Sequence, residues 1–419
     1  MSLTYDLIII GGGPAGMIAG ISAKTNCPNA KILILEKNDS CGKKLLITGN
    51  GRCNLTTANI DINIFMEQLG KKGKWMRDAL NAFPVDATID FFTNLGIELH
   101  TEGENRIFPA SENAVFVRDK LIRKLKDLKV EIKYSSSAKQ ITNDNKEFLI
   151  ITKDNSKYIA NTLLISTGGL SYPTTGSTGD GYILAERLGH SIIKPTAALT
   201  SLKANELWIK DLAGISLKDV KVEVFQSNFK QEERFGDILF THSGLSGPLI
   251  LNLSKHIHHL MNNNSEPISF QIDTLYKENH QQLDLRLQKI CQGKWKKSLK
   301  TFMQELMPTR MAEVFIEYHH LDPNKQIASI LKEERKLIIN SLKQIIVTLG
   351  GVDGFEKATI TSGGVNLKEV NPKTMESTII PNLYFSGEIL DIDGPTGGYN
   401  LQIAWSTGYL AGESLICNS

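Results

Sequence analysis

A short apolar run near the start of the chain ends at a glycine, a pattern typical of a strand buried within a parallel sheet. The run covers residues 5–10, and residues 14–26 follow with helical character and a proline in the first turn. A second apolar run at residues 31–36 completes the pattern. The three segments together predict a strand–helix–strand unit at the beginning of an α/β domain.

The next stretch of the chain mixes helical and strand patterns. We expect helices over 87–95 and 114–128, and strands over 130–134, 148–152 and 163–166. These elements extend the α/β pattern of the first segments.

Beyond about residue 189, apolar and polar residues begin to alternate, which is the pattern of half-buried antiparallel strands. Residues 220–225 show it most clearly, with valine at every second position. Further strands are expected at 238–241 and 268–272. This part of the sequence therefore predicts a small β domain.

Residues 280–344 are rich in Lys, Glu, Leu and Gln and have no strand pattern. They predict several helices, with breaks at Pro308 and Pro323. A glycine-rich, strand-like pattern then returns between about residues 350 and 387, and residues 399–416 predict a final helix. Because the two ends of the chain resemble each other and the middle does not, we expect one domain interrupted by an insertion.

Composition is that of a soluble globular protein. The 419 residues are 41% hydrophobic and 22% charged, which suits two or three domains. No run of about 18 apolar residues predicts a membrane span, and the N-terminus lacks the pattern of a signal peptide. Five scattered cysteines without CxxC spacing predict reduced thiols in a cytoplasmic protein, with neither a disulfide framework nor a metal site. A net charge of +2 argues against a general polyanion binder but allows a local basic patch.

The first glycine cluster fits the G-x-G-x-x-G fingerprint of dinucleotide-binding folds. It runs from Gly11 to Gly16, between an expected strand and an expected helix, and Glu36 lies 20 positions beyond it. Gly11 permits a tight turn, Gly13 lets the backbone approach a pyrophosphate, and Gly16 lets the helix pack on the strand. The helix N-terminus would face the phosphates. Glu36 would accept hydrogen bonds from a ribose, or be a surface acid at a strand end.

Later motifs indicate which dinucleotide binds. Residues 383–388 predict a strand that ends in Gly387-Glu388, residues 391–400 lead into the last helix, and residues 163–169 form a strand that runs into Thr-Gly-Gly. These motifs resemble the signature of glutathione-reductase-type FAD proteins. In that group an acidic residue after a strand-end glycine holds the ribityl chain, and a second helix N-terminus faces the flavin. Glu388 stands where many members carry Asp.

The chain also resembles the BaiN/RdsA-like family of flavoproteins, which is also described as aminoacetone-oxidase-like. Four segments spread over the chain carry this resemblance: residues 43–54 (KKLLITGNGRCN), 106–109 (RIFP), 236–248 (GDILFTHSGLSGP) and 394–400 (GPTGGYN). The resemblance implies an FAD domain interrupted by a β-barrel-like domain, which itself carries a small helical insertion.

We therefore expect an α/β fold with a discontinuous, Rossmann-like three-layer FAD-binding domain. Its expected limits are residues 1–190 and 355–419. The β-barrel-like domain is expected at 191–275 and 345–354, and the helical subdomain at 276–344.

In such a flavoprotein the cofactor does the redox chemistry, while protein groups position the substrate and move protons. Cys53, in a turn expected beside the flavin ring, could donate a proton to a substrate carbon or simply pack as a small buried residue. Arg52 could hold a phosphate or a substrate carbonyl, or form a structural ion pair. Tyr172 could line the pocket or belong to the core. Asn54 and Asn400 could bond the polar edge of the flavin or cap turns.

The expected cofactor contacts gather in the motifs described above. They are Gly11, Gly13, Pro14, Ala15, Gly16, Glu36, Lys37, Lys43, Gly51, Arg52, Asn54, Thr167, Gly168, Gly169, Gly387, Glu388, Asp391, Gly397, Gly398, Asn400 and Leu401.

Some members of the family are linked to reduction of uridine in ribosomal RNA, and others to C=C reduction in bile acids or to amine oxidation. The resemblance favours a reductase that delivers hydride from flavin N5 to a C=C bond, with uridine in ribosomal RNA as the leading substrate. NAD(P)H is the expected reductant, although the sequence offers it no second strand–GxGxxG–helix unit. The alternatives are a small-molecule oxidase or ene-reductase with an amine or steroid-like substrate, and a binding protein with a structural flavin.

Two basic stretches, residues 71–77 and 294–300, each carry a tryptophan among lysines. They could neutralise phosphates and stack on bases of ribosomal RNA. The alternative is a solvated helix face that Trp295 anchors. The sequence does not indicate an oligomeric state.

Overall fold

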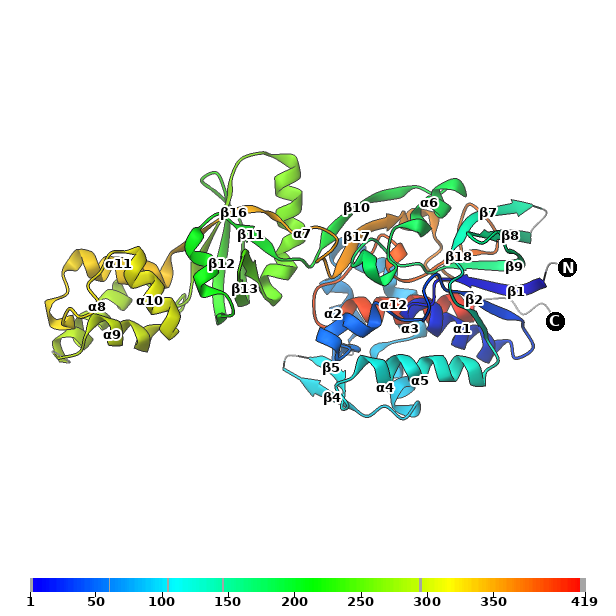
Figure 1. Cartoon of the computed structure of the whole chain (residues 1–419), viewed down its shortest axis with the longest axis horizontal. Coiled ribbons are helices and arrows are strands. Elements are labelled where there is room, and N and C mark those ends of the chain that lie inside the picture. The colour runs from blue at the N-terminus through cyan, green and yellow to red at the C-terminus, as the bar shows by residue number, and fades with distance from the viewer. Residues whose placement is uncertain (1–2, 60, 104, 145–146, 294–295, 415–419) are drawn as a thin grey trace. The chain divides into compact units, whose positions relative to one another are not determined.

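The computed structural model describes residues 3–59, 61–103, 105–144, 147–293 and 296–414. The chain divides into two compact units (Figure 1). The first consists of Met1–Ala197 and Phe355–Ser419, and the second of Ala198–Gly354. Each unit has its own hydrophobic core.

The first unit is built on a seven-stranded sheet of the described chain. Its order is β6-β2-β1-β9-β8-β7, with β18 also paired to β9. Strands β6, β2, β1, β9 and β18 run parallel, whereas β7 and β8 are antiparallel. Their bounds are β1 (Leu3–Ile10), β2 (Ile32–Leu35), β6 (Glu131–Lys133), β7 (Ala138–Asp144), β8 (Glu147–Thr152), β9 (Lys157–Ile165) and β18 (Leu383–Phe385).

Helices cover this sheet because its central strands are apolar on both faces. Helix α1 (Pro14–Asn26) is buried along most of its length, and α12 (Tyr399–Glu413) packs directly on it. Small residues permit the close contact. A Cβ atom added to Gly408 would lie 2.4 Å from the backbone oxygen of Ala15, and one added to Gly412 would lie 2.4 Å from that of Ala19. Because these contacts advance in the same direction along both helices, α1 and α12 run parallel.

Of the other described α-helices of this unit, the longest has 14 residues and the others have 10 or fewer. The expected helices at 87–95 and 114–128 are present as α4 (Val85–Asn94) and α5 (Ala114–Asp127). The structure adds α2 (Ile62–Gln68), α3 (Arg77–Ala82) and α6 (Asp180–Arg187).

Two small sheets complete the first unit, and neither was expected. One has the order β3-β5-β4 and the other pairs β10 with β17. Their bounds are β3 (Thr56–Thr57), β4 (Leu99–Glu102), β5 (Arg106–Pro109), β10 (Ile192–Ala198) and β17 (Ile360–Val365). The Rossmann-like α/β architecture itself is confirmed.

The second unit contains a closed barrel with the order β11-β14-β13-β12-β15-β16. Val220, Val222 and Val224 of β12 are buried, so alternate residues of this strand point into the barrel. The expected barrel-like domain is therefore confirmed. The strands are β11 (Leu202–Ala204), β12 (Ser216–Gln226), β13 (Phe229–Thr241), β14 (Gly244–Ser246), β15 (Ile268–Asp273) and β16 (Ile345–Val352), and helix α7 (Pro248–Asn263) follows β14.

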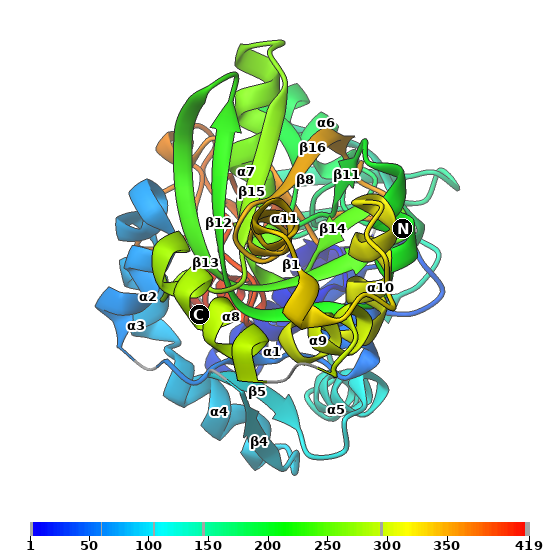
Figure 2. The ribbon, with the colours of Figure 1, turned by 90° about the vertical axis from the view of Figure 1, so that its left-hand side faces the viewer.

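A helical part is inserted between β15 and β16, and it faces the viewer in Figure 2. It consists of α8 (His280–Gly293), α9 (Leu299–Leu306), α10 (Thr309–Tyr318) and α11 (Lys332–Lys343). Pro308 is the N-cap of α10, and Pro323 lies between α10 and α11. Both prolines thus interrupt helices, as their chemistry requires.

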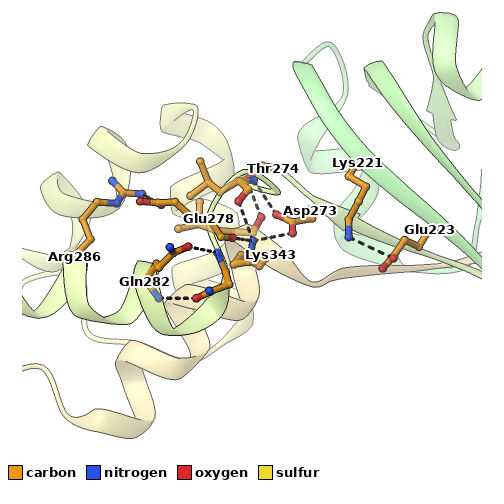
Figure 3. Close-up of polar contacts among 11 residues, drawn as sticks. Lys221, Glu223, Asp273, Thr274, Glu278, Gln282, Arg286 and Lys343 are labelled. Atoms are coloured by element: carbon orange, nitrogen blue, oxygen red, sulfur yellow. Dashed lines mark hydrogen bonds and ion pairs between the residues drawn. The ribbon is translucent and has the colours of Figure 1, made fainter.

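A buried lysine joins the helical part to the barrel (Figure 3). Lys343 ends α11 and is 3% exposed. Its Nζ donates to Asp273 Oδ2 at 2.8 Å and to the backbone oxygens of Leu275 and Glu278 at 2.8 and 2.6 Å. Each of the three ammonium N–H groups therefore has an acceptor. The contact joins the segment that leaves the barrel after β15 to the segment that returns to it before β16.

The cysteines depart in one place from the expectation of reduced thiols. Cys41, Cys53 and Cys291 are free, but Cys27 is disulfide-bonded. The prediction was therefore wrong at Cys27. Among the described helices, none is both long enough and apolar enough to cross a membrane.

Candidate functional site

Four parallel strands end in register at one edge of the large sheet. Ile10 of β1 pairs with Leu35 of β2 and with Ile165 of β9, and Ile165 also pairs with Phe385 of β18. The residues that follow are Gly11, Glu36, Ser166 and Ser386, so all the glycine motifs leave the sheet side by side. Open α/β sheets bind ligands at the carboxyl ends of their strands, which makes this edge the candidate site.

Tight packing explains two glycines of the first motif. A Cβ on Gly16 would lie 2.0 Å from the oxygen of Gly11, and one on Gly11 would lie 2.5 Å from the oxygen of Ser166. Gly11 also has a left-handed φ of +106°. Both residues are therefore required by the protein itself.

Gly13 differs from its neighbours because nothing in the protein requires it to be glycine. Its φ of −76° and ψ of −176° suit any residue, and a Cβ built there would meet no atom within 4 Å. It is the N-cap of α1, and no side chain caps that helix. Pro14 and Ala15 follow in the first turn. An open glycine at an uncapped helix N-terminus is the geometry that a phosphate group needs.

Glu36 is buried and braces the loop after β1. Its Oε2 accepts from the backbone N–H of Gly12 at 2.8 Å, and its Oε1 accepts from the backbone and side-chain nitrogens of Asn38, each at 2.8 Å. Oε1 thus already accepts two hydrogen bonds, whereas Oε2 accepts one and keeps acceptor capacity for a ribose hydroxyl. Lys37 points elsewhere and pairs with Asp180 at 2.9 Å.

The N-terminus of α12 lies beyond that of α1 in the same direction. Gly408 lies against Ala15 near the start of α1, whereas α12 begins at Tyr399, nine residues earlier. At 1.5 Å per residue, the two N-termini are staggered by about 13 Å. Gly387, at the end of β18, approaches the same place, since a Cβ on it would lie 2.7 Å from Cβ of Ala15. Two helix ends thus offer two binding points for one extended ligand.

The start of α12 is held by side-chain amides. Asn400 accepts from the N–H of Gly394 at 2.9 Å and donates to the oxygen of Gly394 at 2.9 Å. The amide of Asn54, oriented so that both its groups are satisfied, accepts from the N–H of Gly398 at 3.0 Å and donates to the oxygen of Thr56 at 3.2 Å. Both asparagines therefore cap turns. Gly397 has a left-handed backbone, and Leu401 is partly exposed in the first turn of α12.

Glu388 is the centre of a polar network at the end of β18. Its Oε2 pairs with Nζ of Lys44 at 2.7 Å. Its Oε1 accepts from the hydroxyl of Ser171 and from the N–H of Thr361, both at 2.8 Å. Lys44 also donates to Ser171 at 2.8 Å. The longer side chain that distinguishes Glu388 from the usual Asp is thus held in one orientation.

Of two adjacent lysines, Lys44 belongs to this network and Lys43 does not. Lys43, the residue expected at the cofactor, pairs with the exposed Asp39 at 2.9 Å. Lys44, Ser171 and Thr361 were not expected. Adjacent lysines have the same chemistry, and only the direction of the local turn separates them.

Two buried hydroxyl groups at the strand ends form no hydrogen bond with the described residues. Oγ1 of Thr167 and Oγ of Ser386 are buried, and neither has a hydrogen-bond partner in the described part of the chain. Thr167 leads through Gly168 into Gly169, whose Cβ would lie 2.4 Å from the hydroxyl oxygen of Thr361. Unpaired buried hydroxyls are costly, so the hydroxyl of Ser386 supports a polar ligand at this edge, whereas that of Thr167 lies against Gly181 of α6, where a Cβ would be 1.9 Å from it.

The turn that carries Cys53 has an unusual backbone. Gly49, Asn50, Gly51 and Cys53 all have left-handed φ values, of +56°, +57°, +85° and +67°. The side chain of Cys53 is fully buried, and this burial raises the pKa of its thiol to about 12, against the opposing effect of a hydrogen bond with Thr48. The thiol is therefore protonated at neutral pH, as a proton donor must be. Its burial is also what a residue that only packs in the core would show.

Arg52 takes the structural role that was the alternative in the sequence. Its guanidinium pairs with Glu102 at 2.5 Å and with Glu112 at 3.3 Å, and it lies 4.2 Å above the ring of Phe108. His100 and these two carboxylates lie within 4.8 Å of one another, but Arg52 already occupies the carboxylates. The arrangement is a surface ion-pair cluster.

Tyr172 is partly exposed and has a left-handed φ of +50°. Its N–H donates to the oxygen of Phe355 at 2.9 Å, next to Ser171 of the Glu388 network. Tyr172 therefore lies beside the Glu388 network. The partners of Arg52, in contrast, are Glu102, Glu112 and Phe108, which do not belong to that network.

The first basic stretch packs back on its own domain. Lys72 pairs with the buried Asp391 at 2.5 Å, and Trp75 packs against the core of the first unit. Lys72 and the partly buried Trp75 thus both contact their own unit. In the second stretch, Lys294 and Trp295 lie outside the described residues, and both Lys297 and Lys300 form ion pairs within the helical part.

Comparison with known proteins agrees with this geometry. The family model described as "HI0933-like protein Rossmann domain" matches residues 5–414. The 3-dehydro-bile acid delta(4,6)-reductase of Clostridium scindens is 31% identical over 406 residues, which cover 97% of this chain and 98% of that protein. The ribosomal RNA dihydrouridine synthase of Haemophilus influenzae is 30% identical over 421 residues, with 99% of both chains covered.

A solved structure shows the same fold at much lower identity. The 3-ketosteroid delta1-dehydrogenase of Sterolibacterium denitrificans, in complex with 1,4-androstadiene-3,17-dione, has a TM-score of 0.53 and 12% identity, and the match covers 98% of this chain and 99% of that one. The family match over nearly the whole chain confirms the resemblance seen in the motifs. The chain belongs to the HI0933-like Rossmann-domain family of FAD-dependent oxidoreductases.

Proposed function

We propose that the protein binds FAD along the carboxyl edge of its parallel sheet and reduces a C=C bond conjugated to a carbonyl group. The observation that carries this proposal is the pair of parallel helix N-termini staggered by about 13 Å. The open position beside Gly13 accommodates the pyrophosphate at α1, and the start of α12 accommodates the flavin end. When bound, FAD supplies a hydride from its N5 atom, and NAD(P)H is the proposed source of electrons.

The residues at the strand ends fit FAD along its length. Glu36 would accept from the adenosine ribose, and Glu388, which Lys44 orients, would accept from hydroxyls of the ribityl chain. The buried hydroxyl of Ser386 would find a partner on the cofactor. All these groups hold the cofactor in position.

The leading substrate is uridine in ribosomal RNA. Conversion of uridine to dihydrouridine saturates a C=C bond next to a carbonyl group, and the names of both full-length relatives indicate chemistry of this kind. One relative is named for ribosomal RNA, and the helical part of this chain supplies cations for such a substrate.

The reaction also needs a group that protonates the substrate carbon. Cys53 is the proposed donor, because burial keeps its thiol protonated and its strained turn holds it in one position. Tyr172, beside the Glu388 network, is the second candidate.

The decisive experiment maps dihydrouridine in ribosomal RNA from cells with and without the gene. The purified protein is then mixed anaerobically with NADH or NADPH and with RNA from the deletion strain. We expect the flavin to bleach and dihydrouridine to form at one position. Bleaching followed by reduction of a 3-ketosteroid enone, with RNA unchanged, would move the substrate to a small molecule. Reduction of the flavin by an amine alone would indicate an oxidase.

A further inference from the structure

The helical part carries a surplus of positive charge. Residues 276–344 contain 13 Lys and Arg residues against 8 Asp and Glu residues, a surplus of five, whereas the whole chain has a surplus of two. The rest of the chain is therefore net negative by three. Because neutralisation of phosphates dominates affinity for nucleic acids, a polyanion would be drawn to this part of the chain.

Several of the positively charged side chains form no ion pair. Ion pairs within the part use Arg286, Lys297, Lys300, Lys325 and Arg335. Four exposed lysines form no ion pair with any described residue: Lys289, Lys296, Lys332 and Lys336.

A groove of about 410 Å³ lies between the end of α8 and the start of α11. We call it the α8–α11 groove. Its apolar lining includes Cys291, Ile327 and Ile330, and its polar lining is Gln288, Gln292 and Arg335.

Two of the cations lie at the edge of this groove. Arg335 Nε pairs with Asp284 at 2.5 Å. The hydrogen bond from Arg335 lowers the pKa of the Asp284 carboxyl, and the charge of Lys332 adds to this effect. Lys332 precedes the groove residue Arg335 by three positions on α11 and so lies on the same side of the helix, and Lys336 is one helical turn beyond Lys332.

We propose that the α8–α11 groove holds an unpaired base of single-stranded RNA while Lys332 and Lys336 contact the flanking phosphates. Aliphatic side chains offer the base an apolar surface to pack against, and the amide of Gln292 and the guanidinium of Arg335 offer hydrogen bonds to its edge. The inference rests on the proposed function, because it names the surface that recruits the RNA substrate.

The first test measures how salt affects RNA binding by the full-length FAD-loaded protein. The probe is a short, labelled, single-stranded oligouridylate, and the variant carries Lys332→Gln and Lys336→Gln. Loss of two phosphate contacts should make the slope of log K against log salt shallower by about 1.4, at about 0.7 per contact on single strands.

A matched control carries Arg123→Gln and Lys126→Gln on α5, where both residues are exposed and form no ion pair with a described residue. It should keep the wild-type slope. If the two double variants lose slope equally, or neither does, the groove is not the RNA site.

The second test uses Cys291 as a reporter of the groove. Cys291 is a free, partly exposed thiol, so its alkylation by iodoacetamide can be followed by peptide mass. The oligouridylate should slow this alkylation, whereas heparin, a polyanion without bases, should not. Equal rates with and without the oligouridylate would overturn the proposal.

The two tests separate this inference from the proposed function. If the oligouridylate binds and protects Cys291 but no dihydrouridine forms, the groove stands and the proposed reaction fails. If dihydrouridine forms while Cys291 stays unprotected and the salt slope is unchanged in the Lys332/Lys336 variant, the reaction stands and the groove fails.

Discussion

Replacing Gly13 by alanine should separate the fold of the first unit from its cofactor site. The native φ of −76° accepts alanine, and the added Cβ would meet no protein atom within 4 Å. Without FAD, the free energy of unfolding of the variant should stay within about 1 kcal/mol of the wild-type value, because the restriction of the unfolded chain by alanine, about 0.4–1 kcal/mol, is offset by the poorer N-cap preference of alanine than of glycine. For a domain of this size, this limit corresponds to a change of at most about 4 °C in Tm.

With FAD the variant should be clearly less stable than the wild type. Crowding by the new methyl group should cost the pyrophosphate one charge-assisted hydrogen bond, or about 1.5–3 kcal/mol of binding free energy. At an FAD concentration of about 100 times the wild-type Kd, the wild type gains about 2.7 kcal/mol of stability and the variant only about 0.3–1.3 kcal/mol. Thermal melts of apoprotein and holoprotein, together with FAD titrations, measure both quantities.

Gly16→Ala is the opposite case. Its Cβ would lie 2.0 Å from the oxygen of Gly11, so this variant should be destabilised even without FAD. If Gly13→Ala bound FAD as tightly as the wild type, the space beside Gly13 would not be the pyrophosphate site and the reasoning would be refuted.

Three other substitutions test separate features. Lys343→Met should lower the free energy of unfolding by about 3–5 kcal/mol in urea titrations, because it leaves the Asp273 carboxylate buried and unpaired, and adding Asp273→Asn should restore most of that loss. Lys44→Met should weaken FAD binding roughly tenfold to a hundredfold by releasing Glu388, whereas Lys43→Met should not; the reverse result would favour the residue expected from the sequence. Cys53→Ala should retain FAD and its reduction but lose about 10²–10⁴ of turnover on RNA, and normal turnover would show that the thiol only packs.

Local periodicity predicted the parts of the fold that depend on local sequence. The β1–α1–β2 unit was clear because β1 ends in an uninterrupted apolar run, β2 is apolar throughout, and the Gly11–Gly16 motif separates β1 from α1. The β3-β5-β4 sheet was missed, since β3 has only two residues and β4 (LHTE) and β5 (RIFP) are short segments of mixed polarity. Their pairing depends on contacts between distant segments.

The backbone positions of the glycine motifs could be predicted from the sequence. The ion-pair and packing partners of individual side chains could be predicted less well. Gly11, Gly13 and Gly16 hold the positions that their spacing implied. The pairing of Lys44 with Glu388 and of Arg52 with Glu102 depends on the direction of a turn that composition does not reveal. The inward packing of Trp75 has the same cause.

The pairing of β18 with β9 has a consequence for synthesis of the chain. Residues Leu163–Ile165 of β9 find their partners in Leu383–Phe385, about 220 residues later. At about 5–20 residues per second, the ribosome needs roughly 10–45 s to make the missing strand, and the open, apolar edge of β9 is exposed meanwhile. The barrel unit lies wholly within this interval and can fold first. A nascent chain that stalls before α12 would therefore carry a folded barrel and an incomplete, aggregation-prone sheet.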